Sequence, residues 1–308
     1  MLIRSRSARI LLVLLVTLLV LAFLSSQTNF AALADSFRAF EWLPWLAALL
    51  VFLLGHCLRY LRYALIWRWP RNRQSFAITG WHGVASYLLP MRLGELVLPA
   101  LAKRLGGQGF IEVLFSLIWL RLLDLLLVAV LAGGFLLFSL WCRAEVIPSP
   151  WWPGGDALLL AQRLPITVLA VLALLVACLA LRWILRCRLG LAASSSEQLR
   201  VLALSLLIWM SVLLMNTLLA YSLGVVLGLD LVIWLLLGAT FAYAIPFQGV
   251  AGLGGHQLVW YAVLVAAALP ATDAMALSIS SHVLTVAWIV VLAVISALVS
   301  WRIGAPPR

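Results

Sequence analysis

The chain contains 308 residues, of which 66% are apolar and only 10% are charged, whereas an average soluble domain is about half apolar and about a quarter charged. The polar residues are too few to cover a water-soluble globule of this size, so the composition excludes a cytosolic enzyme, a secreted disulfide scaffold and a disordered tail, and it indicates an integral membrane protein. The net charge of +11 comes mainly from arginines that stand between apolar stretches, which is typical of cytoplasmic loops rather than of a surface that binds nucleic acid.

Six apolar segments are predicted to cross the membrane. The first follows three arginines, and we interpret it as a retained span that leaves the N-terminus in the cytoplasm, with a cleaved signal peptide as the alternative. Arginine clusters after the second and fourth spans mark cytoplasmic ends, and residues 141–157 are predicted to form an outer loop rich in Pro and Trp. The predicted spans are residues 10–24, 42–66, 110–140, 158–181, 201–226 and 275–299.

Two further apolar segments are each interrupted in the middle. Residues 75–105 are interrupted between Pro90 and Glu95, and residues 231–269 are interrupted by Pro246 and a glycine-rich stretch. Each half has about 15 residues, or roughly 22 Å of helix, which is short of the roughly 30 Å hydrocarbon core. If each segment returns to the side from which it came, the arginine clusters stay cytoplasmic, which favours re-entrant hairpins. Two short full crossings per segment satisfy the same rule.

The predicted order of spans has an internal symmetry. Residues 1–140 and 157–308 each contain three spans and one broken segment, in opposite orientations, which is typical of inverted-repeat transporters whose broken helices meet near the membrane midplane. The predicted fold is therefore an all-α polytopic membrane protein with six full spans and two broken or re-entrant hairpins, equivalent to about eight to ten membrane helices. We expect a single membrane domain over residues 1–308, no soluble domain, and cytoplasmic N- and C-termini.

The first interruption carries two charged residues, Arg92 and Glu95. A charge at membrane depth is costly unless it is paired or hydrated. We interpret the pair as part of a polar pocket in which Arg92 meets an anionic headgroup, while Glu95 pairs with Arg92 or accepts a proton. The alternative is a loop at the membrane surface from which both side chains reach water. Pro90 and Gly94 are predicted to produce the structural break.

The third predicted full span carries Arg121 and Asp124, three residues apart and hence on one helical face. One interpretation is an internal salt bridge that holds helices together. The other is a counter-ion or proton partner inside a binding cavity. Paired charges within a membrane serve both purposes, so both interpretations stay open.

The second interruption is rich in glycine and amide side chains. Glycine permits positive φ angles and close backbone approach, and such a loop can offer N–H groups to an anion. The alternative is a packed glycine turn in which His256 caps the backbone. The candidate binding residues here are Gln248, His256 and Gln257, and the candidate structural breaks are Pro246, Gly249, Gly252, Gly254 and Gly255.

Motifs for catalysis or metal binding are missing from the sequence. It contains no CxxC pair and no HExxH, Walker A or GxSxG motif, and its four cysteines and four histidines are scattered. We therefore expect no catalytic residue, no metal site and no cofactor.

The interruptions resemble those of the flippase-like family named for the transmembrane region of lysylphosphatidylglycerol synthases. The resemblance rests on LLPMRLGE at 88–95, RLLD at 121–124 and IPFQGVAGLGG at 245–255. It implies a lipid-translocating membrane domain. Synthases of the family carry a soluble aminoacyl-transferase domain after the membrane part, whereas this chain ends nine residues after the last predicted span, so we expect it not to make an aminoacylated lipid by itself. The chain departs from the family pattern at Leu98, Leu120 and Gln257, where the family often has Arg, Glu and Glu.

The expected function is transport of an anionic or polyprenyl-linked lipid between the leaflets of a bacterial inner membrane, by a multi-pass protein that is not an enzyme. Arg92, with Arg121, would neutralise a headgroup phosphate, while Glu95 and Asp124 would hold those arginines. The expected partner is a membrane lipid with an anionic headgroup, and no nucleic acid is expected. The alternatives are a membrane transferase acting on a lipid-linked substrate, and an accessory subunit of a glycosyltransferase or lipid synthase.

Overall fold

The computed structural model describes residues 18, 29–106, 108–141, 176, 179–180, 183, 195–244 and 250–301, and within these ranges all regular structure is helical. The predicted first span, the outer loop beyond residue 141 and most of the span predicted over 158–181 lie outside the described residues. The chain divides into two compact units. One combines Met1–Phe115 with Val201–Arg308, and the other is Ser116–Arg200.

Four helices are long and apolar enough to cross a membrane, as judged from their length and composition within the described residues. Three of them confirm the helices predicted over 42–66, 110–140 and 275–299. The four helices are α3 (Trp42–Ile66), α6 (Phe110–Trp141), α8 (Ser195–Ser222) and α11 (Ala271–Trp301).

Helix α8 differs from the predicted span 201–226 at both ends. It begins earlier because Ser195, Ser196 and Glu197 are favourable residues for the first turn of a helix. It ends earlier because Gly224 adopts a φ of +75°, which side-chain-bearing residues rarely adopt. The Val225 N–H then bonds to the Ala220 carbonyl at 3.0 Å, as in a helix-terminating Schellman turn.

Both predicted interruptions are present. The first segment divides into α4 (Arg73–Leu88), the 3₁₀ helix η1 (Pro90–Leu96) and α5 (Val97–Gly106). The second divides into α9 (Leu229–Ala244), the 3₁₀ turn η3 (Val250–Gly252) and α10 (Gly255–Ala266). At 16 and 12 residues, α4 and α10 are about 24 Å and 18 Å long. Each is therefore too short to cross a membrane alone.

A short helix, α2 (Phe30–Arg38), precedes α3 and was not predicted. The side-chain oxygen of Asn29 caps its first turn by accepting the Ala31 N–H at 2.9 Å. The hydroxyl of Ser36 lies 2.6 Å from that of Ser280, which fastens α2 to α11.

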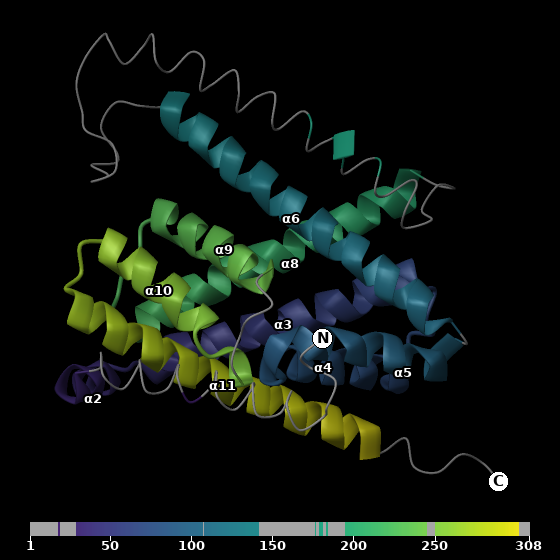
Figure 1. The fold of residues 1–308 in the computed structure, drawn as a ribbon, viewed down its shortest axis with the longest axis horizontal. Helices are drawn as coiled ribbons and strands as arrows, with labels where there is room; N and C mark the ends of the chain where they lie inside the picture. Colours follow the sequence, from purple (N-terminus) through teal and green to yellow (C-terminus); the bar gives the residue numbers. More distant parts are fainter. Residues whose placement is uncertain are drawn as a thin grey trace, which may run out of the picture. The chain divides into compact units, whose positions relative to one another are not determined.

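Helix α11 is the element on which the first unit is assembled. It contacts α2, α3, α4 and α10, and Figure 1 shows α10 along one half of α11 and α4 along the other. Small residues permit the close approach of these helices. A Cβ added at Gly80 of α4 would overlap the Ser296 side chain of α11, and one added at Gly83 would come within 2.6 Å of His56 Nε2 on α3.

The contacts along α11 give the depth at which both interruptions lie. Helix α4 runs antiparallel to α11, because Trp81 bonds to Ser300 near the end of α11 whereas Tyr87 reaches His282. At the start of α10, His256 bonds to Ser281, the neighbour of His282. His282 lies about 16 Å along α11 from Ala271, and the 31 residues of α11 span about 46 Å. Both interruptions therefore lie well inside the length of a spanning helix.

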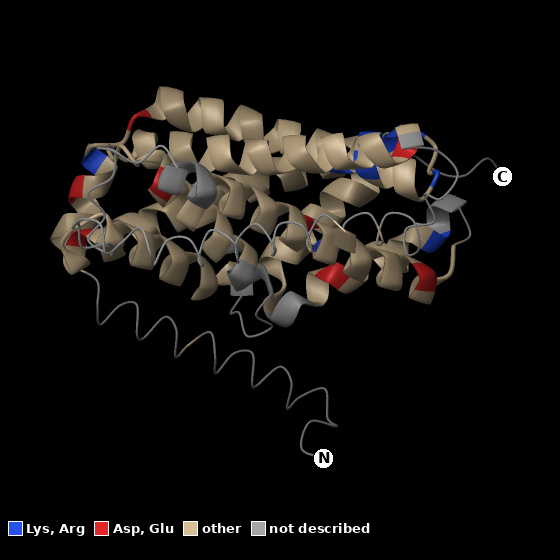
Figure 2. Ribbon diagram, turned by 90° about the horizontal axis from the view of Figure 1, so that it is seen from above, with Lys and Arg blue, Asp and Glu red and all other residues tan. Residues whose placement is uncertain are grey.

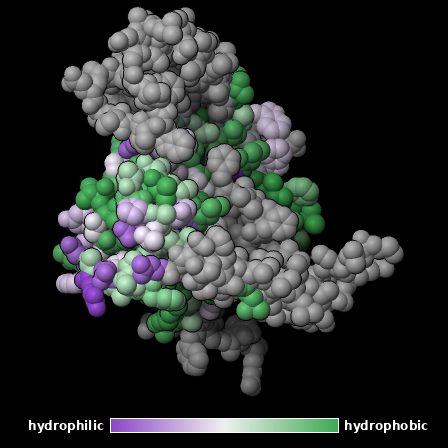
Figure 3. Space-filling view, turned by 60° about the vertical axis from the view of Figure 1, so that its left-hand side comes forward, coloured by the Kyte–Doolittle hydropathy of each residue, from purple (hydrophilic) through white to green (hydrophobic). Residues whose placement is uncertain are grey.

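The charged residues of the first unit are unevenly distributed. Arg59, Arg68, Arg71 and Arg73 gather where α3 ends and α4 begins, whereas Asp35 and Asp273 lie at the opposite end, on α2 and the start of α11 (Figure 2). Figure 3, viewed from the side of that opposite end, shows hydrophilic side chains in purple grouped among apolar ones. The arginine-rich end is the one that the sequence predicts to be cytoplasmic.

Candidate functional site

The two interruptions meet in the first unit. Both η1 and α4 contact η3. The first interruption, which carries Glu95, therefore contacts the glycine-rich turn that leads into α10, where the second group of predicted site residues lies. Pro246, Gln248 and Gly249 lie outside the described residues.

Pro90 and Gly94 build the first interruption. Pro90 occupies the first turn of η1, where its missing N–H is not needed, and Leu89 before it is extended, as residues before proline tend to be. Gly94 is buried, and a Cβ there would overlap the backbone of Ala85 and Ser86. Glycine is therefore required at this position, because η1 folds back tightly onto the end of α4.

Glu95 lies beside a histidine that the sequence analysis did not select. His82 Nε2 on α4 is 3.4 Å from Glu95 Oε2. The side chain of Glu95 is 20% exposed and that of His82 only 4%. The backbone of Arg92 belongs to η1, but its side chain lies outside the described residues. A carboxylate next to an imidazole can share or pass a proton, so the chemistry predicted for Glu95 has a second participant.

The glycine-rich turn is held by Gln257. Gly252 and Gly254 have φ angles of +73° and +93°, and Ala251 one of +57°. These values explain why glycine dominates here. The Gly254 N–H donates to Gln257 Oε1 at 2.8 Å, and Gln257 is 3% exposed. Gln257, rather than His256, therefore caps the backbone at the start of α10.

We expect Gln257→Ala to lower the free energy of unfolding by about 1 kcal/mol, because it leaves a backbone N–H without its acceptor. Gln257→Glu should keep most of the stability, since a carboxylate accepts the same bond and suits a helix N-terminus. Denaturant titration in detergent micelles measures both. Leu258→Ala, at a neighbouring position that is 63% exposed, is the control, and an equal loss in this control would contradict the assignment.

His256 faces α11. Its Nε2 lies 3.0 Å from Ser281 Oγ, and its ring stacks on Trp260 with 5.9 Å between centroids. Its ring also meets that of His282 edge to face, at 5.1 Å. Tyr87 Oη on α4 lies 3.4 Å from His282 Nδ1. The predicted residue His256 thus belongs to a polar cluster of which three further members, His282, Tyr87 and Ser281, were missed.

Arg121 and Asp124 belong to the part of α6 in the second unit. Arg121 is exposed and Asp124 is 4% exposed. Each takes part in a polar or electrostatic interaction. In the same unit Trp119 packs edge to face against Trp183, with 5.5 Å between ring centroids. The buried carboxylate and exposed guanidinium remain compatible with both interpretations of the pair.

A buried arginine near the end of α3 was also missed, because it stands beside the arginines that mark the cytoplasmic end of this span. Arg62 is 1% exposed, and its Nη1 donates to Ser205 Oγ on α8 at 2.9 Å. The signal that could have found Arg62 and the histidines is the same: an ionisable residue inside an apolar helix is a functional candidate. Within the described ranges, no three His, Cys, Asp or Glu side chains are placed to hold a metal ion.

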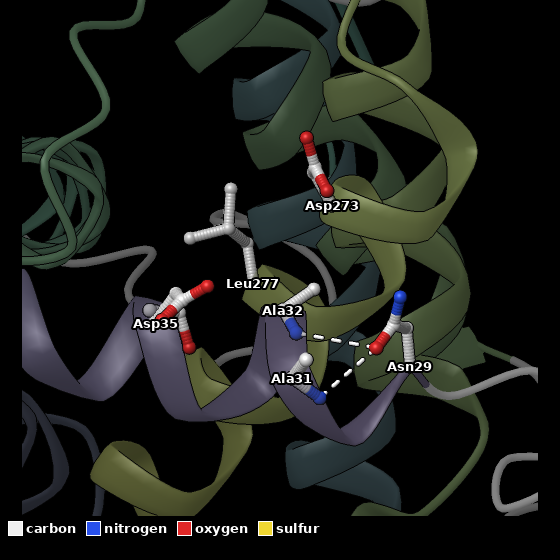
Figure 4. Close-up of a pocket in the computed structure, with 7 residues that line it drawn as sticks. Asn29, Ala31, Ala32, Asp35, Asp273 and Leu277 are labelled. Atoms are coloured by element: carbon white, nitrogen blue, oxygen red, sulfur yellow. Dashed lines mark hydrogen bonds between the residues drawn. The ribbon is translucent and has the colours of Figure 1, made fainter.

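A separate pocket of about 410 Å³ lies between α2 and the start of α11 (Figure 4). Two carboxylates, Asp35 and Asp273, line it, and Asp35 is paired with Arg38 at 2.8 Å. None of the residues predicted to bind an anionic headgroup lines this pocket. Its acidic lining does not suit an anion, so it is distinct from the site at the interruptions.

The structure thus has two helical interruptions in contact, one with a carboxylate beside a histidine and the other with a glycine-rich turn beside a histidine cluster. Neither a curated protein nor a solved structure matches this chain significantly. One family model, described as "Lysylphosphatidylglycerol synthase TM region", matches residues 10–294. Since the match extends over nearly the whole chain, this multi-pass membrane protein belongs to the family of the lysylphosphatidylglycerol synthase TM region.

Proposed function

We propose that this protein transports an anionic or polyprenyl-linked lipid between the leaflets of a bacterial inner membrane, and that it is not an enzyme. The observation that supports this most is the contact between η1 and η3. Two helices interrupted at membrane depth and brought together are typical of transporters, whose substrate sites form where broken helices meet.

The polar groups at the interruptions suit a lipid headgroup. Glu95, His82 and His256 lie at a level where unpaired charge is costly, so they need a function or partners. A phosphate would be neutralised by Arg92 of η1 and would accept hydrogen bonds from N–H groups of the glycine-rich turn. The acyl or polyprenyl tails would stay in the lipid, because they gain nothing from a polar environment.

The arrangement of the half-helices also favours transport. Helix α4 extends from the arginine-rich end of the first unit and ends at the level of His282. Helix α10 begins at the level of Ser281 and extends to the opposite end of the unit. A site between two half-helices that enter from opposite sides can open to either leaflet when one half moves against the other.

We expect Arg92→Ala to slow lipid transfer roughly 10- to 100-fold, which corresponds to the loss of a charge-assisted hydrogen bond. The purified protein is reconstituted into vesicles with a fluorescent phosphatidylglycerol, and an impermeant reductant measures how fast inner-leaflet lipid reaches the outer leaflet. Arg92→Lys should retain part of the rate. Arg38→Ala removes an exposed arginine paired with Asp35 and should leave the rate unchanged.

Wild-type protein that moves lipid no faster than protein-free vesicles would overturn the proposal. Mass spectrometry of the lipid after the assay separates the alternatives. A covalently changed lipid would indicate a membrane transferase. Transfer that requires an added glycosyltransferase or lipid synthase would indicate an accessory subunit.

A further inference from the structure

A line of polar side chains connects the helices that flank the two interruptions. Tyr87 Oη on α4 lies 3.4 Å from His282 Nδ1 on α11, the rings of His282 and His256 are 5.1 Å apart, and His256 Nε2 on α10 lies 3.0 Å from Ser281 Oγ. We name these four residues the histidine bridge. All four lie in the first unit.

The hydrogen bonds assign a tautomer to His256. The Ser281 hydroxyl has one proton, which it donates to the Ser278 carbonyl at 2.9 Å. Its oxygen must therefore accept the bond from His256, so Nε2 of His256 carries a hydrogen. Neutral His256 then has its lone pair on Nδ1, which is where an added proton would bind.

The described contacts of the two imidazole rings include no carboxylate that could pair with a protonated histidine. Among the contacts that the structure describes for the rings of His256 and His282, the partners are Trp260, Tyr87 and Ser281, and none is a carboxylate. His282 is 6% exposed and Ser281 fully buried. His256 is partly exposed. A proton added to His282 would therefore create a desolvated charge about 5 Å from another imidazole, which is unfavourable while the interruptions are in contact.

In the described part of the chain, no charged side chain of the helices packed around the bridge contacts the rings of His256 or His282. Helix α2 meets α11 through Ser36 and Ser280, α3 through Phe52 and Trp288, and α9 meets α10 through Gly238 and Val259. The other titratable side chains of the core lie in separate contacts. His82 is beside Glu95, and His56 bonds to the Phe52 carbonyl.

We propose that the histidine bridge is a proton-sensitive clamp that holds the two interruptions together while its imidazoles are neutral and releases them when one is protonated. The regulation rests on the proposed transport function, because it acts on the same site. Protonation favours any arrangement in which the ring reaches water, so acid shifts the population towards a state with the interruptions apart. Because histidine in water takes up a proton near about pH 6.5, the shift should occur between neutral and mildly acidic pH.

Spin labels measure the separation directly. Cysteines replace Leu93 on η1 and Leu258 on α10, which are 48% and 63% exposed, in a variant whose native cysteines are replaced. Double electron–electron resonance in nanodiscs should show one main distance at about pH 8, with a longer component of at most about a tenth. At about pH 5.5 the ratio of the longer to the shorter component should rise by up to roughly tenfold for each histidine that reaches water in the separated arrangement.

Three variants test the origin of this shift. The double variant His256→Gln/His282→Gln cannot titrate, so its distribution of distances should be the same at both pH values. His56→Gln removes a buried histidine outside the bridge and should respond to acid as the wild type does. Tyr87→Phe removes only a hydroxyl and should show an enlarged longer component at neutral pH.

Absence of a pH-dependent distance in the wild type, or its persistence in the double variant, would overturn the clamp. The distances do not depend on transport, so the two proposals fail separately. Lipid transfer without a pH-dependent distance would leave transport standing and remove the clamp. A pH-dependent distance without lipid transfer would remove the transport function.

Discussion

Gly94→Ala is expected to lower the free energy of unfolding by about 1–3 kcal/mol, the usual cost of overpacking a tight contact. The new Cβ would overlap the backbone of Ala85 and Ser86. Backbone atoms cannot rotate away as a side chain can, so η1 must move off the end of α4. Because η1 also contacts η3, the same change should slow lipid transfer. Denaturant titration in mixed micelles measures the first effect, and the vesicle assay measures the second.

Gly134→Ala provides the matched control. Gly134 lies within α6, and a Cβ there would meet nothing within 4 Å. Alanine in place of an exposed helical glycine should stabilise the protein by about 0.5–1 kcal/mol, because the unfolded chain loses freedom. If the two substitutions had the same effect on stability, the tight packing assigned to Gly94 would be wrong.

Trp288→Ala is expected to cost about 3 kcal/mol of unfolding free energy, the lower end of the range for buried aromatic residues in soluble proteins. Trp288 is fully buried on α11, where its ring lies 5.7 Å from that of Phe52 and 6.3 Å from that of Trp45, both on α3. In a membrane the transfer of the ring out of lipid contributes little, so the cost comes chiefly from lost packing contacts and the cavity that remains.

Two variants separate this packing role from other effects. Trp288→Phe keeps most of the ring contacts, and the indole Nε1 that it removes has no hydrogen-bond partner among the described residues. The loss of unfolding free energy in Trp288→Phe should therefore be well below that in Trp288→Ala. Val290→Ala changes a residue of α11 that is 56% exposed and should be close to neutral. A similar stability of Trp288→Ala and Val290→Ala would contradict the central place of α11 in the fold.

The long helices and the two interruptions could be predicted because their causes are local. An apolar run of spanning length forms a helix in lipid, and Pro90 or a cluster of glycines interrupts one. The ends of α8 were less predictable. Its start depends on a capping pattern in a polar stretch, and its end depends on the positive φ of Gly224. Helix α2 was missed because its nine residues are too few to be predicted as a membrane span, and its position depends on packing against α11, which includes the contact between Ser36 and Ser280.

The positions of the interruptions were predictable, whereas the contacts of their polar residues were not. Gly94 and Glu95 could be selected from the sequence because they follow Pro90 within an apolar segment. In the structure both lie in η1, at the predicted break. The partners of Glu95 and His256 come from other helices: His82 is 13 residues from Glu95, and Ser281 is 25 residues from His256. No local pattern encodes such pairings, because they are created by the packing of α4 and α10 on α11. Gln257, a candidate binding residue, also has a structural role that was not predicted, because its side chain caps the start of α10.

Chemical cross-linking shows whether the two interruptions lie against each other inside the membrane, as the contact between η1 and η3 indicates. Cysteines replace Leu93 of η1 and Ala251 of η3 in a variant without native cysteines, and a short flexible bis-maleimide is added to intact membranes. We expect efficient intramolecular cross-linking of this pair. Leu93 paired with Val226, which lies beyond the end of α8 and is 83% exposed, should not be linked. Linking of the control pair but not of Leu93 with Ala251 would mean that the two interruptions lie apart.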